Sequence, residues 1–129
     1  MSDLLTATEY AAIAENLTFP NGTFINGAFR SAASGKTLET KNPATGEKLT
    51  DLAACGAQDV NDAVAAAKEA FEDGRWRLQH PAERKAVLLK LAQLMESHAH
   101  ELAVLESLDS GKPIRECQTV DVPDTINTL

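Results

Sequence analysis

The feature that most constrains the fold is a change of hydrophobic period near residue 57. Before this point, apolar and polar residues alternate over short stretches that turn residues separate, which is the pattern of short strands. After it, apolar residues recur with the period of an α-helix, and the first stripe consists of Val60, Val64, Ala67 and Phe71. The chain has 129 residues, of which 43% are hydrophobic. It therefore suits one α/β domain, with short strands first and long helices afterwards.

The strand region contains two predicted hairpins. Asn26-Gly27 lies between the apolar pairs 24–25 and 28–29, and Asn-Gly tolerates the positive φ angles of a two-residue type I′ turn. A second pair of strands is predicted within residues 37–53, on either side of the turn sequence NPATGE. A weak helix over residues 6–16, capped by Thr6 or Thr8, is predicted to precede both hairpins.

The helical region has clear start and stop signals. The first helix is predicted to begin at residue 58 or 59 and to end at Gly74. Pro81 suits the first position of the next helix, because a missing N–H is harmless there. Ser97 is expected to interrupt that helix, and Gly111 supplies the following C-terminal stop. A last helix is predicted to begin between residues 115 and 122.

Charge and hydropathy exclude two classes of partner. The formal net charge of −7 argues against a nucleic acid, whose backbone requires a basic protein surface. No apolar run approaches the roughly 18 residues of a membrane span. The N-terminal sequence lacks the basic and apolar segments of a secretion signal. These observations favour a cytoplasmic protein that binds neither nucleic acid nor membrane.

Neither cysteine has the setting of a nucleophile or a metal ligand. Cys55 and Cys117 lie outside any CxxC pattern, and neither has a histidine in its local pattern that could act as a base. Both are predicted to be free thiols. Three glutamates of the helical region are interpreted as a solvated face: Glu96, Glu101 and Glu106.

Several motifs occur in a fixed order. FINGAFR, NPATGEKL and ELAVLESLDSGKP are separated by VNDAVAAAKEAFEDGRWR and PAERKAVLLKLAQLMESHAHEL. Each is weak alone, but the set at this spacing resembles the N-terminal part of the aldehyde dehydrogenase superfamily. The resemblance covers residues 22–129. Within the superfamily, residues 94–115 are most similar to bacterial dehydrogenases of γ-glutamyl-aminobutyraldehyde and related ω-aminoaldehydes.

The resemblance implies an enzyme that oxidises a small-molecule aldehyde to a carboxylate with NAD or NADP. Residues 1–21 would form an N-terminal segment, and residues 22–129 the front part of a Rossmann-like cofactor-binding domain. The family's catalytic cysteine and glutamate and its cofactor motif match no residue of this chain. We therefore expect the chain to be a piece of a longer homo-oligomer, dimeric or tetrameric, and to be inactive alone. The alternative is a stand-alone, non-catalytic interaction or oligomerisation module.

The resemblance also implies a monovalent cation site. In part of the family, an aspartate that matches Asp109 holds the cation together with backbone carbonyls that match Thr40 and Lys41. Carboxylate and carbonyl oxygens suit a hard cation. The alternative is that Asp109 only polarises the C-terminus of a helix, where an acid requires a compensating partner. The ammonium group of Lys41 could also replace the cation.

The pair Asp121 and Asp124 has two interpretations. By resemblance, this helix lines the substrate tunnel, and acids at these positions attract the ammonium end of an aminoaldehyde. Positions three apart lie on one helical face, so both carboxylates could face one channel. Alternatively, Asp121 is the N-cap of the last helix and accepts a hydrogen bond from the N–H of Asp124. Pro123 in the first turn is compatible with that cap.

Overall fold

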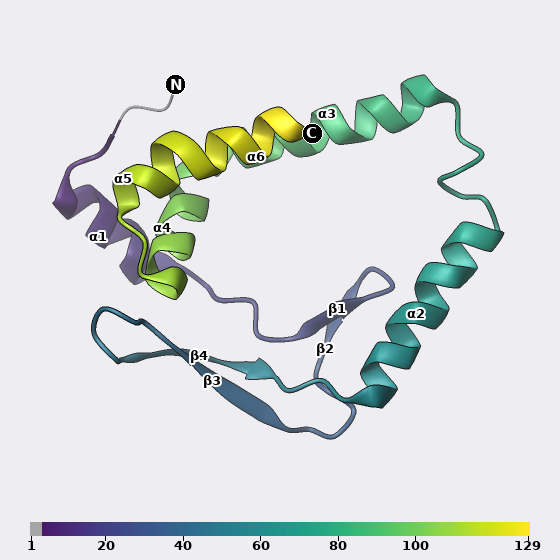
Figure 1. The fold of residues 1–129 in the computed structure, drawn as a ribbon, viewed down its shortest axis with the longest axis horizontal. Coiled ribbons are helices and arrows are strands. Elements are labelled where there is room, and N and C mark those ends of the chain that lie inside the picture. The colour runs from purple at the N-terminus through teal and green to yellow at the C-terminus, as the bar shows by residue number, and fades with distance from the viewer. Residues whose placement is uncertain (1–3) are drawn as a thin grey trace. The chain divides into compact units, whose positions relative to one another are not determined.

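The computed structural model describes residues 4–129 and contains short strands followed by helices, as predicted (Figure 1). The chain divides into two compact units. One comprises Phe19–Thr40 and Lys48–Arg84, and we call it the hairpin unit. The other comprises Met1–Thr18, Lys41–Glu47 and Lys85–Leu129, and we call it the helical unit.

Both predicted hairpins are present. Strands β1 (Thr23–Ile25) and β2 (Ala28–Arg30) pair antiparallel. Asn26 and Gly27 have φ angles of 51° and 79°, so the Asn-Gly turn has the predicted conformation. Strands β3 (Thr37–Lys41) and β4 (Lys48–Ala53) form the second pair.

Helix α2 (Ala57–Glu72) completes the hairpin unit, and a buried aspartate caps its start. The N–H of Gly56 donates to Asp59 Oδ2 and the N–H of Ala33 donates to Asp59 Oδ1, both at 2.8 Å. Because one carboxylate satisfies both amides, Asp59 joins the segment after β2 to the first turn of α2.

The helical unit begins with α1 (Ala7–Asn16), which Thr6 caps as predicted. The N–H of Glu9 donates to Thr6 Oγ1, and the N–H of Thr6 donates to Glu9 Oε2, which is a capping box. Helix α3 (Pro81–Ser97) belongs to this unit from Lys85 onward, and α4 (Ala99–Ser110) follows it. Gly111 ends α4 with a φ of 75°, which confirms the predicted stop.

The last helical segment is continuous from Ile114 to Thr128. It consists of α5 (Ile114–Glu116), a π-helical turn η1 (Cys117–Asp121) and α6 (Val122–Thr128). It begins one residue before the predicted range. Helices α1 and α4 pack together, and η1 and α6 pack against α4. This packing buries a small core of Ala99, Ala103, Cys117 and Val122, flanked by Leu102, Ile114 and Ile126.

Within the part of the chain that the structure describes, no helix has the length and apolar character needed to cross a membrane.

Candidate functional site

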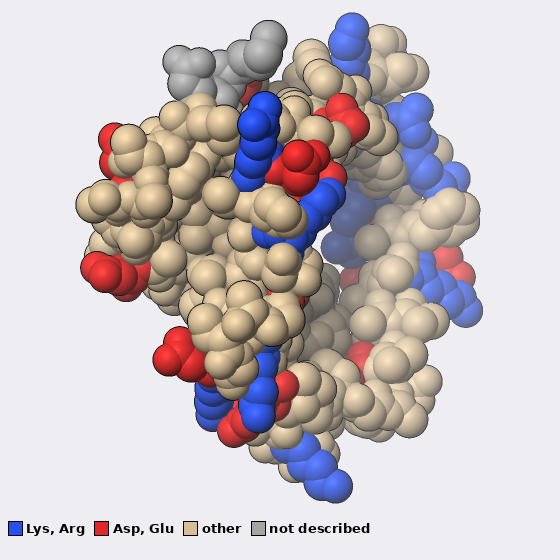
Figure 2. Space-filling model, turned by 60° about the vertical axis from the view of Figure 1, so that its left-hand side comes forward, with Lys and Arg blue, Asp and Glu red and all other residues tan. Residues whose placement is uncertain are grey.

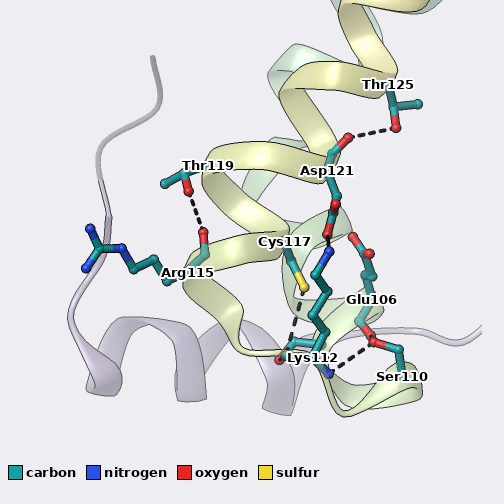
Figure 3. A network of polar contacts seen from close by, with 9 residues as sticks. Glu106, Ser110, Lys112, Arg115, Cys117, Thr119, Asp121 and Thr125 are labelled. Carbon is teal, nitrogen blue, oxygen red and sulfur yellow. Dashed lines mark hydrogen bonds and ion pairs between the residues drawn. The ribbon is translucent and has the colours of Figure 1, made fainter.

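The principal polar cluster of the helical unit is centred on Asp121, at the end of η1 (Figure 3). The side chain of Asp121 points toward α4 and is half-buried. The ammonium group of Lys112 donates a hydrogen bond to Asp121 Oδ2. Lys112 lies directly after the stop at Gly111, so the loop between α4 and α5 delivers a positive charge to the last helix.

The backbone of Lys112 is fixed by three contacts. The hydroxyl of Ser107 donates to the carbonyl oxygen of Lys112 at 2.7 Å. The N–H of Lys112 donates to Ser110 Oγ at 3.2 Å, and the thiol of Cys117 lies 3.9 Å from the Lys112 carbonyl oxygen. The ammonium group therefore extends from a loop residue whose backbone is held by contacts with Ser107, Ser110 and Cys117.

Glu106 is the second carboxylate of the cluster. A carboxylate oxygen of Glu106, the sulfur of Cys117 and a carboxylate oxygen of Asp121 all lie within 4.8 Å of one another. The prediction that Glu106 belongs to a solvated face is wrong, because its side chain is half-buried and faces Lys112 and Asp121 (Figure 3). Lys112 supplies the positive charge that a metal ion would bring to such a cluster.

The pKa values of the carboxyl and thiol groups in this cluster are shifted in different directions. Burial, followed by the neighbouring charge of Asp121, raises the pKa of Glu106. The hydrogen bond from Lys112 lowers the pKa of Asp121, which stays ionised. Burial, followed by the charge of Glu106, raises the pKa of the Cys117 thiol. Cys117 is fully buried, and a thiol with a raised pKa stays neutral and is a poor nucleophile.

The π-helical turn shows that Asp121 does not cap the last helix. The N–H of Val122 bonds to the carbonyl of Cys117, five residues earlier, so the helix passes through Asp121 without a break. Asp121 has helical angles of −66° and −49°, and its side chain makes no capping hydrogen bond. Capping by Asp121 is therefore wrong, because the helix begins at Ile114 and leaves no free N–H groups at this position.

Asp124 lies one turn further along, in α6, and is exposed. Its carbonyl oxygen accepts a hydrogen bond from the hydroxyl of Thr128 at 2.8 Å. The two aspartates are thus on one continuous helix but in different environments. Asp121 is half-buried and paired with Lys112, whereas the carboxylate of Asp124 is turned to the surface of the unit.

A buried amide fixes the π-helical turn to its neighbours. Gln118 is fully buried, and its Oε1 lies 3.0 Å from His100 Nδ1, so with this amide orientation Nδ1 carries the proton. The ring of Tyr10, from α1, meets the ring of His100 edge-on with 6.3 Å between their centroids. The segment that carries Asp121 is therefore linked to α4 through Gln118 and His100, and His100 in turn contacts α1 through Tyr10.

The residues of the predicted cation site are distributed between the two units. Asp109 is exposed in the last turn of α4, and Lys41 ends β3; both belong to the helical unit. A Cβ added to Gly111 would lie 2.8 Å from Cγ of Pro43, so the turn after Lys41 packs closely on the end of α4. Thr40 belongs to the hairpin unit.

Sequence reasoning missed Glu106, Lys112 and Cys117 as one cluster. The spacing places Glu106 on one helical face with Ala99 and Ala103, but only the structure shows that this face is buried. No local signal brings Lys112 to Asp121, since that contact depends on how the last helix folds back on α4.

On the face shown in Figure 2, acidic and basic side chains are scattered over a mostly uncharged surface.

Comparison with known proteins shows the family of the chain. Residues 29–129 match the sequence model of the Aldehyde dehydrogenase family. The chain is 63% identical over 129 residues to aminoacetaldehyde dehydrogenase of Pseudomonas aeruginosa, covering 100% of this chain and 26% of that protein. It is 49% identical over 114 residues to the NADP/NAD-dependent aldehyde dehydrogenase PuuC of Escherichia coli, covering 88% of this chain and 23% of that protein.

The structural comparison agrees. The crystal structure of γ-glutamyl-γ-aminobutyraldehyde dehydrogenase from Burkholderia cenocepacia superposes with a TM-score of 0.93 and 46% identity, over 95% of this chain and 25% of that one. This similarity confirms the predicted fold class, the first part of a Rossmann-like domain. The chain spans about a quarter of the length of these relatives. It belongs to the aldehyde dehydrogenase family.

Proposed function

We propose that this chain forms the N-terminal part of an NAD(P)+-dependent aldehyde dehydrogenase that oxidises an aminoaldehyde to a carboxylate. Identity of 63% over the whole chain to an aminoacetaldehyde dehydrogenase supports the substrate class. The observation that carries the proposal within the structure is the exposed carboxylate of Asp124 in α6, next to the half-buried Asp121.

The role of these carboxylates follows from the substrate's charge. An aminoaldehyde is a cation at neutral pH, and an ammonium group that leaves water requires an anionic partner. Asp121 and Asp124 supply negative charge from one helix, and Asp124 is the more accessible of the two. In this proposal, the chain binds and orients the amino end of the substrate.

The chemical step requires groups outside this chain. Cys117 is buried with a raised thiol pKa, and neither Cys117 nor Cys55 matches the family's nucleophile. The nicotinamide cofactor supplies the hydride acceptor when bound, as NAD or NADP. The described residues contribute substrate recognition and packing.

Steady-state kinetics of the full-length enzyme test this proposal. Formation of reduced nicotinamide is measured with NAD+ and NADP+, using an aminoaldehyde and a neutral aldehyde of the same chain length. We expect kcat/KM to be higher for the aminoaldehyde by about tenfold or more, the worth of one charge-assisted hydrogen bond. Absence of cofactor reduction with either aldehyde would overturn the proposal.

We also propose that Asp109 binds a monovalent cation together with the carbonyl oxygens of Thr40 and Lys41. The close packing of Pro43 on Gly111 supports this idea, because it holds the turn after Lys41 at the end of α4. Potassium or sodium should then raise the Tm of the full-length enzyme relative to tetramethylammonium at equal ionic strength. Asp109→Asn should remove the difference, and an equal Tm in all salts would refute the site.

The remaining part of the proposal concerns assembly and location. We propose a cytoplasmic homo-oligomer, dimeric or tetrameric, in which residues 22–129 begin the cofactor-binding domain and residues 1–21 precede it. Native mass spectrometry of the full-length enzyme would measure the subunit number. A monomer at micromolar concentration would contradict this part.

A further inference from the structure

The two aspartates of the last helix differ in the charge that surrounds them. Asp121 is half-buried and receives a hydrogen bond from the ammonium group of Lys112. Glu106 brings a second carboxylate to the same place (Figure 3). Asp124 lies one helical turn away and is exposed.

We propose that Lys112 and Glu106 act as positioning residues that hold Asp121 away from the substrate, so that Asp124 alone recognises its ammonium group. This inference rests on the proposed function. It makes the loop after α4 a determinant of cation preference, although neither Lys112 nor Glu106 touches the substrate.

The ammonium group of a substrate would compete with that of Lys112 for Asp121. A substrate ammonium could reach Asp121 only by displacing Lys112, which is tethered to the same chain and needs no binding entropy to stay. Three contacts of the Lys112 backbone with Ser107, Ser110 and Cys117 maintain that tether. The covalently attached ammonium therefore has the advantage over a diffusing one.

Glu106 adds a second carboxylate next to Asp121. The charge of Glu106 also acts on the Lys112 ammonium that bonds to Asp121. Loss of Lys112 would leave two carboxylates without their cation, and such a pair attracts another cation. Removing the lysine charge should therefore create a second ammonium site and not merely a cavity.

The experiment measures the ratio of kcat/KM for an aminoaldehyde to that for a neutral aldehyde of equal length, in the full-length enzyme. Lys112→Met should raise the ratio about threefold to tenfold, because Asp121 becomes accessible to the substrate cation. Lys112→Arg, which keeps the charge, should leave the ratio as in the wild type. Adding Asp121→Asn to Lys112→Met should abolish the rise. Lys90→Met, on the exposed surface of α3, is the matched control.

A comparison that leaves Lys112 in place covers the case in which Lys112→Met does not fold. Asp124→Asn should lower the ratio by about tenfold or more, whereas Asp121→Asn should lower it by less than about twofold. Equal losses from both substitutions would overturn the inference. So would an unchanged or lower ratio in folded Lys112→Met.

Failure of the proposed function would look different. If neither Asp124→Asn nor Asp121→Asn changed the ratio in the otherwise wild-type enzyme, the helix would not recognise the ammonium group at all. If Asp121→Asn lowered the ratio and Asp124→Asn did not, the inference would be overturned while the proposed function stood. If Asp124→Asn lowered the ratio but Lys112→Met did not raise it, only the role of Lys112 would be refuted.

Discussion

The last helical segment and helix α2 carry apolar residues of similar periodicity, yet they differ in what covers them. In the helical unit, Val122 is 6% exposed and Ala103 is fully buried, because α4 packs against the last helix. In the hairpin unit, Val64 and Phe71 are 61% and 66% exposed. Periodicity therefore identifies which face of a helix is apolar, but only a packed partner makes that face a core.

The two units also differ in how each satisfies an aspartate that is withdrawn from solvent. Asp59 in the hairpin unit is only 5% exposed and is satisfied by two backbone amides close by. Asp121 in the helical unit is satisfied by Lys112, which a neighbouring loop supplies. Asp59 thus has a structural role at a helix start, whereas Asp121 depends on a charged side chain that a single substitution can remove.

The largest effect is expected in the core of the helical unit. Ala103→Leu introduces three carbon atoms at a fully buried position, and such overpacking costs about 1–3 kcal/mol. Hydrogen exchange of the 129-residue chain should show lower protection of α4 and the last helix. Ala67→Leu, on the exposed stripe of α2, is the matched control and should change protection little. Equal losses of protection in both variants would show that the core of the helical unit and the stripe of α2 are packed alike.

Acid should weaken the hairpin unit through Asp59. Hydrogen bonds from Gly56 and then Ala33 lower the pKa of Asp59 below its ordinary value of 3.8. A lowered folded-state pKa contributes stability that is present above pH 3.8 and is lost as the pH falls through the folded value. Protection of the first turn of α2 should therefore decline in this window. Asp59→Asn should abolish the decline, and an unchanged acid profile would contradict the role of Asp59.

The contribution of Glu106 to stability should depend on pH in the opposite direction to that of Asp59. Its pKa is raised above the ordinary value of 4.5, first by burial and then by the charge of Asp121. A raised folded-state pKa contributes stability that is present below pH 4.5 and is lost as the pH rises through the folded value. Protection of α4 near Glu106 should then increase as the pH falls toward 4.5. Glu106→Gln should flatten this pH dependence. If the protection profile of Glu106→Gln matched that of the wild type, the role of Glu106 would be contradicted.

The smallest effect on stability is expected on the stripe of α2. Val64→Lys replaces an exposed apolar side chain and should change stability by no more than about 0.5 kcal/mol. Loss of an exposed apolar residue should instead reduce binding of a hydrophobic dye to the 129-residue chain. Val122→Lys is the buried counterpart and should lower the protection of the last helix, in line with the loss expected for Ala103→Leu. A large loss of stability in Val64→Lys would show that the stripe is covered.

Residues with a local backbone role were predictable from the sequence. Thr6 as a cap, Asn26-Gly27 as a turn and Gly111 as a stop all act through the backbone within a few residues of themselves. Asp121 was harder, because two interpretations of the same residue were open. The structure excludes the cap through a continuous helix that begins at Ile114.

The cluster around Asp121 depends on tertiary contacts, which the local pattern does not contain. Glu106 resembled a solvated acid among other glutamates, and its burial follows from the packing of η1 on α4. Gln118, fully buried against His100, gave no signal in its polar neighbourhood. In physical terms, hydrogen-bonded turns and caps are local, whereas buried polar pairs require two distant segments to meet.

Asp124→Asn in the full-length enzyme tests the central claim most directly. The substitution keeps the size of the side chain, removes the charge that we assign to recognition of the substrate ammonium, and replaces one acceptor oxygen with an NH2 donor. We predict that kcat/KM falls about tenfold or more for an aminoaldehyde and by less than about twofold for a neutral aldehyde of equal length. An equal change for both aldehydes would contradict the account.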